Sequence, residues 1–116
     1  MGMQIRNIVE LLKAKILTPG LNLMGEVDHA FTSDLMSDVL TGDYDKTVLI
    51  TGLSNLQAIR TAEIADIREV IIGRNKKVSP EMVELAFDND IVLLQSSYSL
   101  YKISGILYGA GVKPIY

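Results

Sequence analysis

Residues 47–73 read TVLITGLSNLQAIRTAEIADIREVIIG, and this stretch decides the fold. Its first five residues form a continuous run rich in β-branched side chains, which is typical of a strand covered on both faces. A helix follows, with Ser54 as its predicted cap, Gln57 completing a capping box, and apolar residues at helical spacing to about residue 66. Residues 69–73 form a second apolar run. A strand, a helix and a strand in this order predict two parallel strands joined by a right-handed crossover.

The same pattern continues toward the C-terminus. Residues 79–81 (Ser-Pro-Glu) start a helix, because they supply a capping hydroxyl, a proline at the first helical position and an acid in the first turn. Residues 91–94 form a third strand of the buried type. Ser96 or Ser97 is the predicted cap of a last helix, which ends at residues 109–111.

The first half of the chain has less regular patterning. Its predicted elements are a helix over residues 3–14, strands at 16–18 and 30–32, a connection over 21–27, and a short helix capped by Ser33 or Asp34 that ends near Gly42. Because strands and helices alternate, we expect an α/β fold, a three-layer α/β/α sandwich with a mostly parallel sheet of about four to five strands. We expect one domain over residues 3–116, with residues 1 and 2 as an expression remnant.

Composition excludes several kinds of function. The 116 residues include no cysteine and one histidine, which excludes disulfides, thiolate zinc sites, cysteine nucleophiles and two-histidine metal motifs. The 11 Lys and Arg against 14 Asp and Glu give a net charge of −3, which is not typical of a nucleic-acid-binding protein. The first residues do not have the basic and apolar pattern of a signal peptide, so we expect none, and no apolar run reaches about 18 residues. We therefore expect a cytoplasmic protein that binds neither nucleic acid nor membrane.

The sequence offers no catalytic machinery. His29 follows Asp28, but a general base needs a nucleophile or bound water within reach, and none is identifiable. Asp34 and Asp38 share a helix face, but acids at a helix start more often complement the helix dipole than bind a cation. Neither the P-loop nor the dinucleotide glycine motif is present. We expect no enzymatic activity, no metal and no cofactor.

A candidate ligand site lies in the turns that follow the three clear strands. Ligands of open parallel sheets bind beyond the carboxyl ends of the strands, where these turns meet. The turns offer hydroxyls, helix-start amides and one guanidinium, which suit an anion such as phosphate or carboxylate. The alternative is that the serines only cap helices and the glycines only turn the chain. The candidate ligand residues are Thr51, Gly52, Ser54, Asn55, Gly73, Arg74, Ser96 and Ser97.

A candidate interface lies on the last helix. Tyr98, Tyr101, Gly105 and Tyr108 share one face of it, away from its apolar residues. Tyrosine is enriched at interfaces because it buries a large area and keeps a polar tip, and a small residue permits close approach. The alternative is that these tyrosines cover the edge of the sheet. We expect a self-association surface, and with it a homodimer.

Residues 33–39 (SDLMSDV) are close to the Asp-Leu-Leu-Ser-Asp-Val stretch of a known domain family. From about Ile5 to Val112 the chain resembles this family, the DRTGG domains. The name residues differ, because Leu53-Ser54 stands where the family has Asp-Arg, and residues 72–74 (Ile-Gly-Arg) stand where it has Thr-Gly-Gly. These differences imply either a ligand unlike that of typical members or a loss of binding.

The resemblance implies a regulatory module without catalysis, with a three-layer α/β/α fold. Such domains accompany CBS pairs and phosphate acetyltransferases, and they are similar to the amino-terminal domain of HPr kinase/phosphorylase. A stand-alone copy would work as a homo-oligomer or through a partner protein. We therefore expect a sensor of a small anionic metabolite or nucleotide that acts as a homodimer. The alternative is a protein–protein interaction module that binds no ligand.

Overall fold

The strand predicted most clearly, β5 (Thr47–Thr51), lies inside a six-stranded sheet of order β2-β7-β6-β5-β4-β8. Strands β4 to β7 are parallel, β8 is parallel to β4, and β2 is antiparallel to β7. All residues of β5 are buried, as expected of a strand covered on both faces. The other strands are β2 (Lys15–Ile16), β4 (His29–Thr32), β6 (Glu69–Ile72), β7 (Val92–Gln95) and β8 (Lys113–Pro114).

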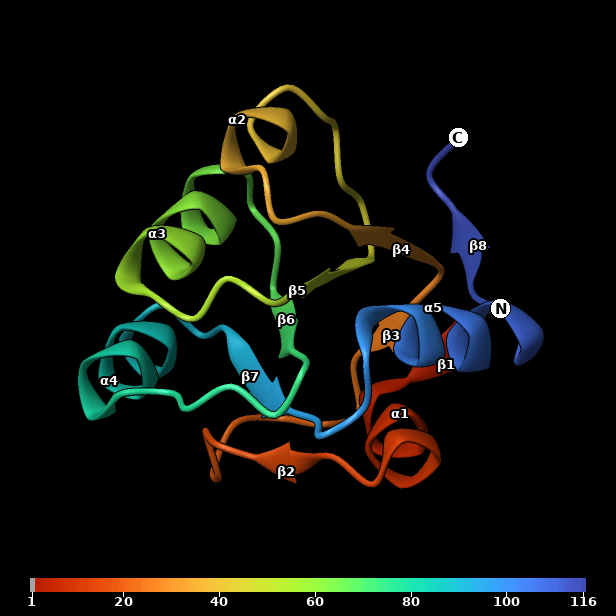
Figure 1. The fold of residues 1–116 in the computed structure, drawn as a ribbon, viewed down its shortest axis with the longest axis horizontal. Helices are drawn as coiled ribbons and strands as arrows, with labels where there is room; N and C mark the ends of the chain where they lie inside the picture. The colour runs from red at the N-terminus through yellow and green to blue at the C-terminus, as the bar shows by residue number, and fades with distance from the viewer. Residues whose placement is uncertain (1) are drawn as a thin grey trace.

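Helices cover both faces of this sheet in the computed structural model (Figure 1). Leu49 and Val70 of the sheet pack with Ile59 in one core, and Val48 and Ile71 belong to a second core on the opposite face. The predicted three-layer α/β/α fold is confirmed. The helices of the first face are α2 (Met36–Val39), α3 (Leu56–Ile64) and α4 (Pro80–Asp88), and those of the second are α1 (Ile5–Leu12) and α5 (Leu100–Gly109).

The structure describes residues 2–116, so Met1, which we expected to lie outside the domain with Gly2, is not among the described residues. Within this range no helix is both long and apolar enough to cross a membrane. The sheet has six strands instead of four to five because it includes β8, an edge strand of only two residues. The sequence did not predict β8, since proline and lysine are poor strand formers.

The first half departs from the predicted boundaries at its start. The helix α1 begins at Ile5 and not at residue 3, because β1 (Met3–Gln4) pairs antiparallel with β3 (Glu26–Val27). That partner lies in the segment predicted as a connection. The short strand predicted at 16–18 is shifted to Lys15–Ile16, and Thr18 Oγ1 instead accepts a hydrogen bond from the Leu93 N–H at 3.1 Å.

Three predicted helix caps are wrong, and the serines at 33, 54 and 96 bond to other groups. Asn55, not Ser54, caps α3 by accepting from the Ala58 N–H at 3.1 Å, because the Ser54 hydroxyl donates to the Lys77 carbonyl. Ser99 caps α5, because Ser96 Oγ accepts from the Tyr98 N–H in a turn that delays the helix. Neither Ser33 nor Asp34 caps α2, whose N-cap Leu35 makes no side-chain bond. The predicted cap Ser79 is confirmed, at 3.2 Å from the Met82 amide.

Candidate functional site

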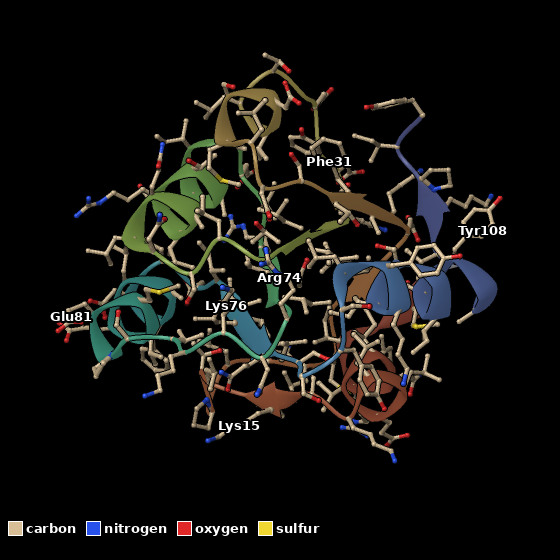
Figure 2. All side chains as sticks on the ribbon, viewed as in Figure 1. Lys15, Phe31, Arg74, Lys76, Glu81 and Tyr108 are labelled. Carbon is tan, nitrogen blue, oxygen red and sulfur yellow. The ribbon has the colours of Figure 1, made fainter. Side chains whose placement is uncertain are left out.

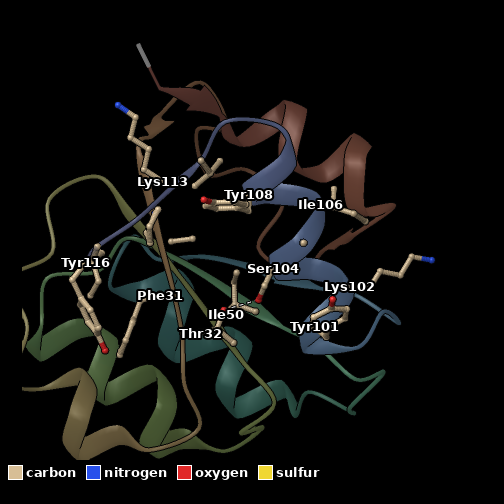
Figure 3. Close-up of a pocket in the computed structure, with 15 residues that line it drawn as sticks. Phe31, Thr32, Ile50, Tyr101, Lys102, Ser104, Ile106, Tyr108, Lys113 and Tyr116 are labelled. Carbon is tan, nitrogen blue, oxygen red and sulfur yellow. Dashed lines mark hydrogen bonds between the residues drawn. The ribbon is translucent and has the colours of Figure 1, made fainter.

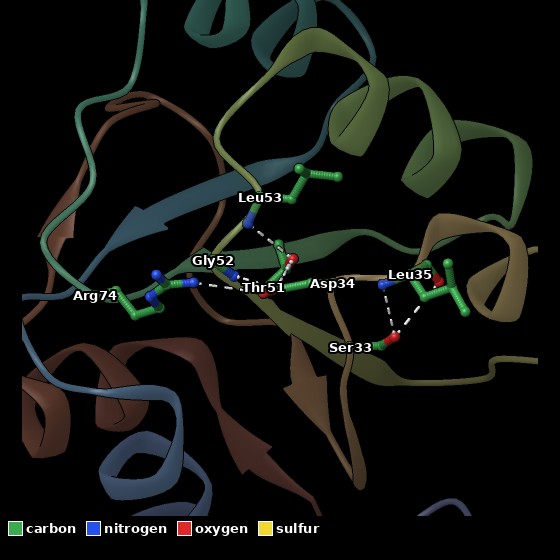
Figure 4. Close-up of polar contacts among 7 residues, drawn as sticks. All are labelled: Ser33, Asp34, Leu35, Thr51, Gly52, Leu53 and Arg74. Atoms are coloured by element: carbon green, nitrogen blue, oxygen red, sulfur yellow. Dashed lines mark hydrogen bonds and ion pairs between the residues drawn. The ribbon is translucent and has the colours of Figure 1, made fainter.

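The carboxyl ends of β4, β5 and β6 meet at a polar cluster centred on Asp34 (Figure 4). Asp34 Oδ1 accepts from the Gly52 N–H at 2.7 Å and from the Thr51 hydroxyl at 2.9 Å. Arg74 Nη1 lies 3.6 Å from the other carboxylate oxygen, Oδ2. The side chains of Asp34 and Arg74 are 44% and 48% exposed. We call these four residues the Asp34 cluster, and it holds one carboxylate at an open surface by three donors.

The chain after β4 turns so that Asp34 faces β5. The Ser33 N–H donates to the Ile50 carbonyl at 3.0 Å, which extends the pairing of β4 with β5 by one residue. Ser33 Oγ then accepts from the Leu35 N–H at 3.0 Å, a serine turn that ends the strand. Asp34 therefore lies between β4 and α2 and belongs to neither.

Gly52 makes room for the arginine of the cluster. A Cβ at this position would lie 2.8 Å from Arg74 Cδ, so a side chain here would push the guanidinium away from Asp34. Thr51 Oγ1 also accepts from the Leu53 N–H at 3.1 Å, which fixes the direction of the hydroxyl proton toward Asp34. The cluster therefore depends on a glycine at position 52, which leaves space for Arg74, and on a hydroxyl at position 51, which donates to Asp34.

The loop that carries Arg74 is held firmly against the start of α5. Arg74 and Asn75 both have left-handed backbone, with φ of 64° and 54°, a conformation that costs a non-glycine residue about 1–2 kcal/mol. Their N–H groups donate to the carbonyls of Tyr98 at 2.8 Å and Ser96 at 3.1 Å. A Cβ at Gly73 would lie 2.8 Å from the side chains of Leu100 and Ile103 of α5. Glycine at this position thus permits the close packing that positions Arg74.

The cluster has a cationic flank. Residues 73–77 (Gly-Arg-Asn-Lys-Lys) contain three cations and no acid. Figure 2 shows Arg74 and Lys76 over the middle of the sheet and Tyr108 on α5, away from them. Gln95 Nε2 donates to the Lys76 carbonyl at 2.5 Å, so the end of β7 supports this loop as well.

The structure brings together some of the predicted ligand residues and gives others structural partners. Thr51, Gly52 and Arg74 meet in the Asp34 cluster, and Gly73 packs under α5. Ser97 is exposed, and its neighbours Ser96 and Tyr98 accept hydrogen bonds from the loop that carries Arg74. The remaining three, Ser54, Asn55 and Ser96, bond to backbone groups as described above.

Sequence reasoning missed Asp34 as the centre of the site. It considered Asp34 as a helix cap and, with Asp38, as an acid that more often complements the helix dipole than binds a cation. The signal that could have found it is position, because Asp34 follows the predicted strand at 30–32 by two residues and carboxyl ends of neighbouring parallel strands meet. Among residues 2–116, no three carboxylate or imidazole side chains are grouped as a metal site would require. His29 lies at the amino end of β4, at the opposite edge.

The predicted interface residues do not all share one surface. Tyr101 and Tyr108 are 90% and 70% exposed, and a Cβ at Gly105 would meet nothing within 4 Å. Tyr98 instead packs against the core under α1 and α5, and the Lys102 ammonium lies 3.9 Å above its ring. Of the four predicted interface residues, Tyr101, Gly105 and Tyr108 are therefore the ones exposed on α5, and we call them the exposed α5 surface.

A groove of about 740 Å³ runs beside this surface (Figure 3). Its floor includes Ala30 and Ile50 of the sheet, and α5 and the segment 112–116 form its sides. β8 pairs only with His29 and Ala30, which leaves the second half of β4 at the open edge of the sheet. We call this hollow the α5 groove. Sequence reasoning did not predict it.

Comparisons with known proteins point to one class of domain. No protein-family model matches the chain. The chain is 26% identical over 98 residues to HPr kinase/phosphorylase of Lactococcus lactis subsp. lactis (strain IL1403). The matched region covers 84% of this chain and 31% of that protein. The same enzyme of Lactococcus lactis subsp. cremoris (strain MG1363) gives the same values. The chain thus spans about a third of the length of these curated relatives.

A solved structure shares the fold over nearly the whole chain. It contains the CBS and DRTGG domains of the regulatory region of Clostridium perfringens pyrophosphatase, in complex with the activator diadenosine tetraphosphate. The TM-score is 0.75 at 14% identity, over 97% of this chain and 48% of that chain. The chain is therefore similar in fold to a CBS and DRTGG regulatory region and distantly similar in sequence to HPr kinase/phosphorylase, which supports a DRTGG-like domain.

Proposed function

We propose that this chain is a non-catalytic DRTGG-like regulatory domain that binds a small anionic metabolite or nucleotide at the carboxyl edge of its sheet and acts as a homodimer. The observation that carries the ligand class is the Asp34 cluster. A backbone N–H, a hydroxyl and a guanidinium converge there on a carboxylate, and the same donors suit a phosphate. The cationic loop 73–77 adds charge of the required sign.

Similarity to known proteins supports the same class of ligand. The pyrophosphatase region of similar fold was crystallised with a nucleotide that carries four phosphates. Catalysis is not part of the proposal, because the Asp34 cluster contains no histidine and its carboxylate is already paired with donors. The ligand would contact Thr51, Gly52 and Arg74, with Ser97 beside them.

A thermal-shift screen tests this function. The probes are inorganic phosphate, pyrophosphate, acetyl phosphate, coenzyme A, adenosine nucleotides and diadenosine tetraphosphate. A ligand at about 100 times its Kd adds roughly 2.7 kcal/mol, which raises the Tm of a domain this size by about 10 °C. Arg74→Ala should weaken the affinity about 10- to 100-fold, whereas Arg60→Ala, an exposed arginine of α3, should not. A flat screen with every probe at millimolar concentration contradicts the ligand part of the proposal.

The second candidate function is an interaction module, and the α5 groove favours it. Its proposed occupant is a second copy of this chain. The ridge formed by Tyr101 and Tyr108 lies next to the groove, so two copies related by a twofold axis can each place the ridge in the groove of the other. None of the residues that line the groove is acidic, and most are apolar or aromatic. The groove has two cations, Lys113 and Lys102, and the Lys102 ammonium lies over the Tyr98 ring.

A further inference from the structure

We propose that Asp34 is a built-in competitor of the anionic ligand, which must displace the Asp34 carboxylate to reach its donors. This inference rests on the proposed function and adds how that site is regulated. The Gly52 N–H and the Thr51 hydroxyl both point at Asp34 Oδ1, at 2.7 and 2.9 Å. A second anion on the same two donors would lie within a few ångströms of the carboxylate, where like charges repel. The ligand and Asp34 therefore exclude one another.

The Asp34 side chain lies at the surface, where a competing anion can reach it. The carboxylate is 44% exposed, and the ion pair with Arg74 is long, at 3.6 Å. The next residue, Leu35, is 57% exposed. It occupies the N-cap position of α2, and no side chain there bonds to the helix amides. The core residues Met36 and Val39 anchor α2 from its other side. Displacement of Asp34 would thus change the turn 33–35 and leave the packing of α2 against the sheet in place.

Arg74 stays available to both anions. Its backbone is fixed by the bond from its N–H to the Tyr98 carbonyl, but its guanidinium contacts Asp34 by only one ion pair. An exposed guanidinium presents several N–H donors, so it can turn from a carboxylate to a phosphate without moving the loop. In the exchange, Asp34 loses its three donors to the ligand and becomes solvated.

The direct test compares the affinity for pyrophosphate of the wild type, Asp34→Asn and Asp38→Asn by isothermal titration calorimetry. Asparagine keeps an oxygen that can accept from Gly52 and Thr51, but it removes the competing charge. We expect Asp34→Asn to bind at least about tenfold more tightly than the wild type, the size of one charge-assisted hydrogen bond. Asp38→Asn makes the same change in net charge at an exposed position of α2, and this variant should bind pyrophosphate as tightly as the wild type does.

The outcomes separate this inference from the proposed function. If the wild type binds pyrophosphate and Asp34→Asn binds equally or less tightly, the competition is wrong and the ligand site stands. If neither protein binds any probe of the thermal-shift screen, the proposed function fails and the inference fails with it. If Asp34→Asn does not fold, nuclear magnetic resonance of the wild type decides. The Gly52 amide and the Asp34 carboxyl carbon should then shift together on titration, and a shift of Gly52 alone overturns the displacement.

Discussion

The hydroxyl groups of Thr32 and Ser104 lie 2.8 Å apart and join the end of β4 to the middle of α5. Thr32 precedes Asp34 by two residues, and Ser104 precedes Gly105 of the exposed α5 surface. Both hydroxyls also line the α5 groove. This hydrogen bond therefore joins the strand that leads to Asp34 to the helix that carries Tyr101 and Tyr108.

A double-mutant cycle measures this connection. Thr32→Val, Ser104→Ala and the double variant each remove the hydrogen bond at an exposed site, so each single change should cost about 0.5–1.5 kcal/mol of unfolding free energy. Because both changes remove the same bond, the double variant should cost less than the sum of the two. Urea unfolding of the four proteins gives the coupling energy. Strict additivity would mean that the two hydroxyls are independent.

Gly73 and Gly105 differ in what a methyl group would meet. Gly73→Ala should lower the unfolding free energy by about 1–3 kcal/mol, because the new Cβ would lie 2.8 Å from the side chains of Leu100 and Ile103. Gly105→Ala is the matched control on α5, where a Cβ meets nothing within 4 Å. It should raise stability by up to about 1 kcal/mol through helix propensity. Thermal melts check both, and equal effects of the two variants would contradict the packing argument.

The regular part of the fold could be predicted because its signals are local. The run at 47–51 is the observed strand β5, and the start of α4 at Pro80 follows directly from Ser79, Pro80 and Glu81. Caps were harder to predict where several capping residues are adjacent. Both Ser54 and Asn55 can cap α3, and the choice depends on a carbonyl of Lys77 that is distant in sequence.

The centre of the site could not be predicted from local pattern. Asp34 is 17 and 18 residues away from Thr51 and Gly52, and only the parallel pairing of β4 with β5 brings them together. The α5 groove also depends on the pairing of strands that are distant in sequence. It depends on β8, a strand of two residues that leaves part of β4 open, and no periodicity in the sequence indicates such a strand. The sequence predicted that the turns after β5 and β6 lie at one edge of the sheet, and the structure brings Gly52 and Arg74 of these turns together around Asp34.

Glu69 predicts a pH dependence of stability. Burial raises the pKa of this carboxyl from 4.5 to about 7, with Arg68 acting in the opposite direction. Between these two pH values the folded chain keeps a proton that the unfolded chain has lost, so stability falls as the pH rises. Above about pH 7 the full penalty is present, on the order of 3 kcal/mol, and below pH 4.5 there is none.

Glu69→Gln removes this titration. Its advantage in unfolding free energy over the wild type should grow from pH 4.5 to pH 7 and stay constant above that, as measured by urea unfolding at a series of pH values. Glu63→Gln, an exposed glutamate of α3, is the control and should show no such growth. An advantage of Glu69→Gln that is the same at pH 4 and pH 8 would mean that the carboxyl is not perturbed by burial.

The exposed tyrosines of α5 predict the oligomeric state. If Tyr101 and Tyr108 anchor a twofold contact, the double variant Tyr101→Ser, Tyr108→Ser should sediment as a single 12.8 kDa protomer at concentrations where the wild type is a dimer. Its melting temperature should also lose the dependence on protein concentration that a dimer shows. Phe87→Ser changes an exposed aromatic residue on α4, on the opposite face of the sheet, and should leave the mass unchanged. A dimer that persists in the tyrosine double variant would place the contact elsewhere, because these two side chains form the ridge that a second copy would insert.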